Sequence, residues 1–171
     1  MSVLCDSQLI ELCEEKALVT PFDVGLINPA SIDLRVGFEY RPEKRYLDPS
    51  PTDTLWNEPV MLGDGYLLEY GETILLDTLE YVSIPIHCMA EMWLKSSAGR
   101  NGLDIYKAGY IDPGFHGTLT FRLTNNTHRP WLVQSGQRLV QMVVRQMSEA
   151  PTRSYELTGR YNGQIGPTIA R

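Results

Sequence analysis

The chain has 171 residues and a formal net charge of −6 at pH 7, with 43% hydrophobic and 21% charged residues. This composition is typical of one folded domain and excludes disordered, collagen-like and coiled-coil proteins. The acidic balance argues against a duplex-DNA-binding protein, so we expect no nucleic-acid partner. No apolar run approaches the ~20 residues that span a bilayer, so we expect no membrane partner either.

The start of the chain and its cysteines bear on location. The first residues carry acidic side chains and no basic segment ahead of a hydrophobic run, which is unlike a signal peptide. The three cysteines, Cys5, Cys13 and Cys88, are odd in number and scattered. They suggest free thiols in a reducing compartment, and we therefore predict a cytoplasmic protein.

One short helix is predicted near the N-terminus. Asp6 or Ser7 can cap it, its apolar positions include Leu9 and Cys13, and Pro21 ends it. No other helix is predicted. Residues 40–66 are rich in Pro, Asp and Thr, which indicates a long loop or a series of turns.

From residue 66 onward the pattern is that of β-strands. Short apolar or alternating runs are separated by Gly, Pro, Asn and Asp, which favours a sandwich or small barrel. The predicted strands are 66–69, 73–79, 82–85, 90–94, 103–108, 118–124, 131–133 and 139–145. We predict a single domain over residues 1–171, in which about residues 151–171 form a C-terminal arm that orders over a ligand.

Two segments contain groups suited to ligand binding. The first, residues 95–102, offers the hydroxyls of Ser96 and Ser97 and the guanidinium of Arg100, which suit a polyphosphate, although a polar turn has the same composition. The second contains Asp112-Pro-Gly, a strong turn signal that predicts a hairpin. On the functional interpretation this hairpin presents Asp112, with Phe115 as an apolar platform for a sugar or base.

The strand over residues 118–124 alternates between apolar and polar side chains. Leu119, Phe121 and Leu123 are expected on one face, and Arg122 on the other with three threonines. Arg122 therefore faces solvent or a pocket, and solvent is the default for a lone arginine on a strand.

Taken in order, four segments resemble the dCTP deaminase branch of the dUTPase superfamily, from about residue 27 to the C-terminus. The matching segments are Ile27–Gly37, Lys95–Leu103, Ala108–Gly117 and Gly159–Thr168. The resemblance implies a mainly β, distorted jelly-roll-like dUTPase fold with a short N-terminal helix. It also implies a homotrimer whose active sites lie between subunits and are closed by the C-terminal arm.

The resemblance also implies roles for individual residues toward a pyrimidine deoxynucleoside triphosphate. Asp112 and Arg122 are the candidate catalytic residues. Tyr110 and Phe115 would contact the sugar and base. The residues implied for the phosphates are Ser96, Ser97, Arg100, Tyr155, Arg160 and Gln164. Mg²⁺ is the implied cofactor, carried by the triphosphate rather than by a protein cage, and Asp33 is expected to be structural or close to a metal.

One position departs from the deaminase pattern. Deaminases of this family use a Glu to activate water, and Arg122 occupies the corresponding position here. An arginine stays protonated and cannot act as a general base. We therefore favour hydrolysis of dUTP, or a related nucleotide, to the monophosphate and pyrophosphate, with Asp112 orienting the water. The alternatives are a dCTP deaminase and a non-catalytic nucleotide-binding homologue.

Overall fold

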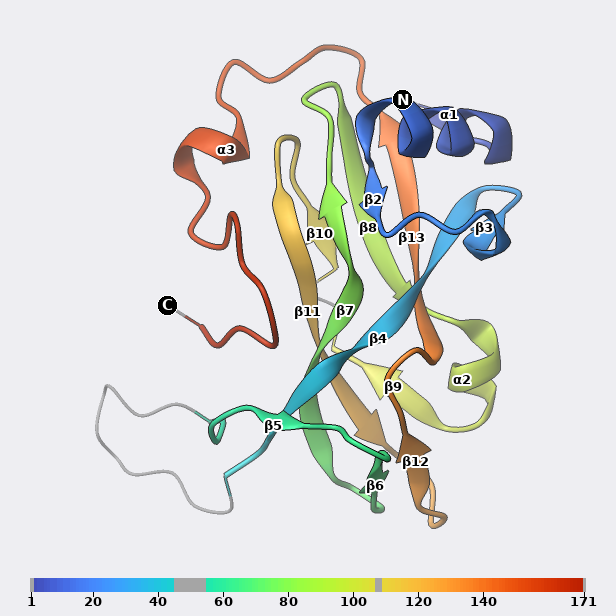
Figure 1. Cartoon of the computed structure of the whole chain (residues 1–171), viewed down its shortest axis with the longest axis vertical. Coiled ribbons are helices and arrows are strands. Elements are labelled where there is room, and N and C mark those ends of the chain that lie inside the picture. Colours follow the sequence, from blue (N-terminus) through green and yellow to red (C-terminus); the bar gives the residue numbers. More distant parts are fainter. Residues whose placement is uncertain (1, 45–54, 107–108, 171) are drawn as a thin grey trace.

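A curled antiparallel sheet of 11 strands forms the centre of the computed structural model (Figure 1), which describes residues 2–44, 55–106 and 109–170. Its main path has the strand order β10-β8-β13-β4-β7-β11-β9, and a second sheet pairs β12 with β6. The longer strands are β4 (Ser31–Pro42), β7 (Thr73–Ser83), β8 (Cys88–Leu94), β11 (His116–Asn125) and β13 (Arg138–Gln146). The shorter ones are β1 (Ser2–Val3), β2 (Val19–Thr20), β3 (Ile27–Asn28), β5 (Val60–Met61), β6 (Tyr66–Leu68), β9 (Leu103–Ile105), β10 (Tyr110–Ile111) and β12 (Trp131–Val133).

The alternating runs form strands because each can bury one face. On β11, Phe121 and Leu123 are buried in the core, whereas Thr120, Arg122 and Thr124 are half-buried on the other face. The predicted runs over 73–79 and 82–85 merge into β7, which pairs with β11 along most of its length. The prediction of a mainly β fold is confirmed. The single-domain boundary stays a prediction.

Strand β4 was not predicted from periodicity, because charged residues interrupt its apolar run. Two of these charged residues, Asp33 and Arg35, are paired with partners distant in the sequence. The buried carboxylate of Asp33 accepts a 2.5 Å hydrogen bond from Lys95, and Arg35 donates to the fully buried Glu80 at 2.6 Å. These pairs remove the cost of burying an isolated charge, so β4 can cross the middle of the sheet (Figure 1).

The predicted N-terminal helix is present as α1 (Asp6–Lys16), with Leu9 and Cys13 buried against the core. The expected cap was wrong by one residue. Cys5 is the N-cap, and its backbone N–H donates to the Gln8 side chain at 3.1 Å.

The prediction of no further helix is also wrong. A 3-10 turn, η1, covers Val24–Leu26, and two short helices are present, α2 (Ser96–Arg100) and α3 (Tyr155–Thr158). Their brevity leaves no measurable helical periodicity in the sequence. None of the helices in the described ranges is long and apolar enough to cross a bilayer.

The proline-rich region between residues 40 and 66 is only partly described. Its ends carry β-structure: β5 pairs with β4, and Glu43 forms an isolated bridge with Trp56. Residues 45–54 of the predicted loop lie outside the described residues.

Candidate functional site

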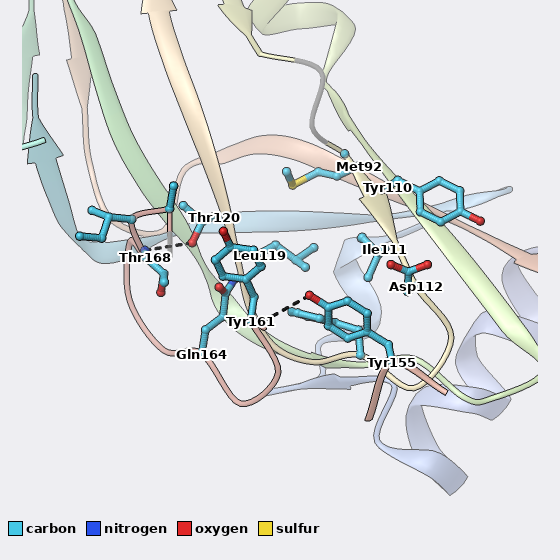
Figure 2. A pocket seen from close by; sticks show the side chains of 14 residues that line it. Met92, Tyr110, Ile111, Asp112, Leu119, Thr120, Tyr155, Tyr161, Gln164 and Thr168 are labelled. Atoms are coloured by element: carbon cyan, nitrogen blue, oxygen red, sulfur yellow. Dashed lines mark hydrogen bonds between the residues drawn. The ribbon is translucent and has the colours of Figure 1, made fainter. Parts of the chain in front are cut away.

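A pocket of about 320 Å³ opens where the hairpin of residues 109–115, strand β11 and the C-terminal segment meet (Figure 2). Its size is at the lower end of the range for small-molecule sites. The described residues that line it are Met92, Gly109, Tyr110, Ile111, Asp112, Phe115, Leu119, Thr120, Tyr155, Tyr161, Gln164, Thr168, Ile169 and Ala170. The structure therefore brings together five predicted site residues, Tyr110, Asp112, Phe115, Tyr155 and Gln164.

The predicted Asp-Pro-Gly turn shapes one wall of the pocket. The Phe115 N–H donates to the Asp112 carbonyl at 3.1 Å, and Gly114 has φ +82°. This left-handed backbone favours glycine, and a Cβ on Gly114 would lie 2.3 Å from Ser154 Oγ. The turn thus needs glycine both for its conformation and for its close contact with the C-terminal segment.

Asp112 places a carboxylate at the edge of the pocket, beside Ile111 (Figure 2). The side chain is half-buried, and it makes no hydrogen bond or ion pair with the described part of the chain. A carboxylate in this state has its oxygen lone pairs available for water or a ligand.

Part of the pocket lining is aromatic. Phe115 is buried and its ring centroid lies 6.0 Å from that of Tyr155, at an interplanar angle of 50°. The Tyr155 hydroxyl accepts a hydrogen bond from the Tyr161 backbone at 3.4 Å (Figure 2). These rings suit the flat, apolar surface of a base or sugar.

The C-terminal segment, residues 151–170, is hydrogen-bonded to the body of its own chain. The Gly163 N–H donates to the His116 carbonyl at 2.7 Å, and the Thr168 N–H donates to Thr120 Oγ1 at 3.1 Å. The Pro167 carbonyl accepts a hydrogen bond from Arg41 Nε at 2.7 Å. This arm therefore forms part of the pocket wall, as an extra segment along β11.

The predicted phosphate-binding residues of the polar segment lie elsewhere. Ser96, Ser97 and Arg100 are exposed on α2 and do not line the pocket. Figure 1 shows α2 and the arm on opposite sides of the sheet. Arg160 belongs to the arm, but it is exposed and is not among the pocket-lining residues. Within a single chain, the two groups of predicted site residues therefore lie apart.

The sequence analysis placed Arg122 in solvent by default, and that expectation is wrong. The residue is half-buried, and its Cζ lies 5.5 Å from the Trp56 ring centroid and 5.7 Å from that of Tyr106. Sequence reasoning missed both aromatic partners, because nothing in the pattern links positions 56, 106 and 122.

A buried carboxyl group beneath the arm was also missed. Burial raises the pKa of Asp77 to about 6, and the nearby charge of Glu39 adds to the increase. Thr118 and the backbone of Gly166 in the arm oppose this increase in the pKa, which places the Asp77 carboxyl group close to the arm. The available sequence signal for this buried carboxyl group was a single Asp within an apolar run.

The segment around Asp33 is structural, since its carboxylate is engaged by Lys95 and by Asn28 Nδ2 at 2.9 Å. Within residues 2–44, 55–106 and 109–170, no three His, Cys, Asp or Glu side chains gather closely enough to hold a metal ion. The expected Mg²⁺, carried by the triphosphate, stays a prediction.

Comparison with known proteins points to one enzyme family. A family model described as dCTP deaminase-like matches residues 3–147. The chain is 35% identical to a protein of Persephonella marina named "dCTP deaminase, dUMP-forming", an alignment that covers 99% of this chain and 96% of that protein. A protein of Corynebacterium glutamicum with the same name is 36% identical, with 90% and 86% covered.

Solved structures agree with this result. A 2'-deoxycytidine 5'-triphosphate deaminase from Agrobacterium tumefaciens matches with a TM-score of 0.69 and 26% identity over 84% of this chain. This chain spans 48% of that deaminase chain. The native EIAV dUTPase matches with a TM-score of 0.50 and 18% identity, covering 80% of this chain and 88% of the dUTPase. That likeness confirms the predicted dUTPase-like fold.

Proposed function

The chain belongs to the dCTP deaminase-like family, and we propose that it forms dUMP from a pyrimidine deoxynucleoside triphosphate. More generally, it is a nucleotide enzyme of the dCTP deaminase and dUTPase superfamily. The observation that carries the proposal is the half-buried, unpaired carboxylate of Asp112 at the mouth of an aromatic pocket.

In the proposed hydrolytic step, Asp112 orients a water molecule. The water oxygen bonds to the α-phosphorus as the bond from that phosphorus to the bridging oxygen breaks. Pyrophosphate leaves, dUMP remains, and the water proton is released to solvent. Such a reaction depends mainly on positioning and on neutralising charge, which a fixed carboxylate and nearby cations can provide.

The names of the relatives favour dCTP as the starting nucleotide. Forming dUMP from dCTP consumes a second water, which adds to C4 of the cytosine ring and displaces ammonia. The comparisons therefore support the deaminase alternative better than hydrolysis of dUTP alone, which the sequence analysis favoured.

Hydrolysis of dUTP without deamination is the second candidate, and Arg122 favours it. A guanidinium has no acceptor atom and stays protonated, so it cannot take a proton from the water that attacks C4. No Asp or Glu occurs between Asp112 and Glu149 to replace it on the same strand.

The phosphates need a source of positive charge, and the described residues of the pocket lining do not provide one. Its described residues include no Lys or Arg, whereas Arg100 is exposed on α2 together with the Ser96 and Ser97 hydroxyls. We therefore propose that α2 of a second copy completes the site, as the expected homotrimer requires. Mg²⁺ bound to the triphosphate would supply further neutralising charge.

The test is to incubate the purified protein and Mg²⁺ with dCTP, dUTP or dTTP, and to measure nucleotide products, ammonia and pyrophosphate. Formation of dUMP, ammonia and pyrophosphate from dCTP supports the proposal in its dCTP form. Formation of dUMP and pyrophosphate from dUTP, with dCTP untouched, supports the second candidate. Binding without any product would instead indicate a non-catalytic nucleotide-binding protein and would overturn the proposal.

A further inference from the structure

Arg122 is held between two aromatic rings. Its Cζ lies within 6 Å of both the Trp56 and the Tyr106 ring centroids, which is the range of a favourable cation–π contact. Trp56 is buried, and Tyr106 is 69% exposed. The ring faces offer no oxygen or nitrogen lone pair, so these contacts do not satisfy the guanidinium N–H donors.

The lack of an acceptor distinguishes Arg122 from the other half-buried arginines of the described chain. Arg35 donates to Glu80, Arg41 to Pro167 and Asn57, and Arg145 to Glu91. Arg122 makes no hydrogen bond or ion pair with the described residues, and its Nε is buried. A buried N–H donor that lacks a hydrogen-bond partner is costly, and Nε of Arg122 is such a donor. The arrangement suits an acceptor that arrives with a ligand.

Arg122 is not itself a lining residue of the pocket described above, but two neighbours in the sequence connect it to that pocket. The alternation of β11 places it on the same face as Thr120, about 7 Å further along the strand, and Thr120 lines the pocket. On the other side, Tyr106 lies three residues before Gly109, which also lines the pocket. Arg122 thus continues the row of polar side chains on β11, two residues beyond Thr120, which accepts a hydrogen bond from Thr168 of the arm.

We propose that Arg122 donates hydrogen bonds to the oxygen at C4 of the nucleobase and thereby selects uracil or thymine over cytosine. A guanidinium only donates hydrogen bonds. The C4 oxygen of uracil or thymine accepts, whereas the C4 amino group of cytosine donates and would leave two donors facing each other. The inference rests on the second candidate function, hydrolysis of a nucleotide without deamination, and names the base of its substrate.

A base carbonyl fits this position better than a phosphate group. Arg122 lies within 6 Å of two aromatic ring centroids, and the nearby pocket has Met92, Ile111, Phe115 and Leu119 in its lining. Flat apolar walls suit a base, whereas a triphosphate requires several cations. The described lining of the pocket offers none.

The test compares the affinities of dUMP and dCMP by calorimetry, so that it does not depend on turnover. Wild-type protein is expected to bind dUMP about tenfold or more tightly than dCMP, the scale of one well-placed base contact. In R122Q the ratio should fall close to one, because a glutamine amide both donates and accepts. R122K, which donates only, should keep a reduced preference for dUMP. R129Q is the matched control, since the Arg129 side chain is exposed and away from the pocket, and its ratio should equal that of the wild type.

Thermal unfolding of each variant verifies that it folds. A dUMP-to-dCMP ratio unchanged in both R122Q and R122K would overturn the inference and leave the proposed function intact. If R122Q instead lost equal affinity for dUMP, dCMP and inorganic pyrophosphate, Arg122 would contact a phosphate group. That result would also overturn the inference. Failure of the wild type to bind either nucleotide would overturn the proposed function together with the inference.

Discussion

Gln164 of the arm and Thr118 of β11 are joined by two hydrogen bonds. The Gln164 side-chain amide donates to the Thr118 carbonyl at 2.7 Å, and the Thr118 N–H donates to the Gln164 carbonyl at 3.0 Å. These bonds extend the isolated parallel bridge between Gly117 and Gln164. Gln164 thus holds the arm in place, in addition to the phosphate contact that the family resemblance implies for it.

Gln164→Ala should loosen the arm. One side-chain hydrogen bond contributes about 1 kcal/mol net, so amide exchange over residues 161–168 should become roughly fivefold faster. The KM for the nucleotide should rise. Hydrogen exchange and steady-state kinetics measure both effects. Ile165→Ala is the control, since Ile165 is 78% exposed, and it should change neither. Unaltered exchange in Gln164→Ala would show that this pair does not hold the arm.

Gly114→Ala should weaken the contact between hairpin and arm. Both Gly114, at φ +82°, and Gly136, at φ +83°, have left-handed backbones, so alanine at either position should cost about 1 kcal/mol. Only at Gly114 would the new Cβ meet Ser154, whereas nothing lies within 4 Å of one on Gly136. Urea unfolding should therefore show a larger loss of stability for Gly114→Ala. Equal losses would contradict a close contact in solution.

Asp77 predicts a dependence of stability on pH. Burial raises its pKa to about 6 from 3.8, so between these values the folded chain keeps a proton that the unfolded chain has lost. The contribution of Asp77 to stability is therefore fully present below about pH 4 and is lost as the pH rises through about 6, by roughly 3 kcal/mol.

This effect is measured by urea unfolding of the wild type and Asp77→Asn between pH 4 and 7. Asparagine does not titrate, so the wild type should lose stability relative to the variant across this window. Subtracting the two curves removes the opposite slopes of other carboxyl groups. A difference that does not change with pH would show that Asp77 titrates normally.

The sequence predicted elements in which the burial pattern is local. The alternation of residues 118–124 gave β11, and the apolar spacing of Leu9 and Cys13 gave α1. It missed β4, because Asp33 and Arg35 read as polar until Lys95 and Glu80 are seen beside them. Such pairs join residues 62 and 45 positions apart, and no local pattern reports them.

The candidate site was likewise predictable only where its residues belong to local motifs. The hairpin of residues 109–117 and the arm were identified from motifs, and the structure joins them in one pocket. The surroundings of Arg122 were not predictable, because Trp56 and Tyr106 reach it only through the fold. The separation of α2 from the pocket was likewise invisible in a linear order of motifs.

The most direct measurement concerns the division of the site between two copies of the chain. Asp112→Asn should lower dUMP formation by about a hundredfold or more while leaving nucleotide affinity measurable. Arg100→Ala should weaken triphosphate binding by about tenfold or more. Each variant alone is expected to be nearly inactive at low nucleotide concentration.

Co-expression of the two variants in equal amounts then tests the account. If Asp112 and Arg100 of each site come from different copies, some mixed assemblies contain intact sites, and roughly a quarter of the wild-type rate of dUMP formation should return. A mixture as inactive as its components, from subunits shown to have assembled together, would contradict a site completed by the α2 helix of a second copy.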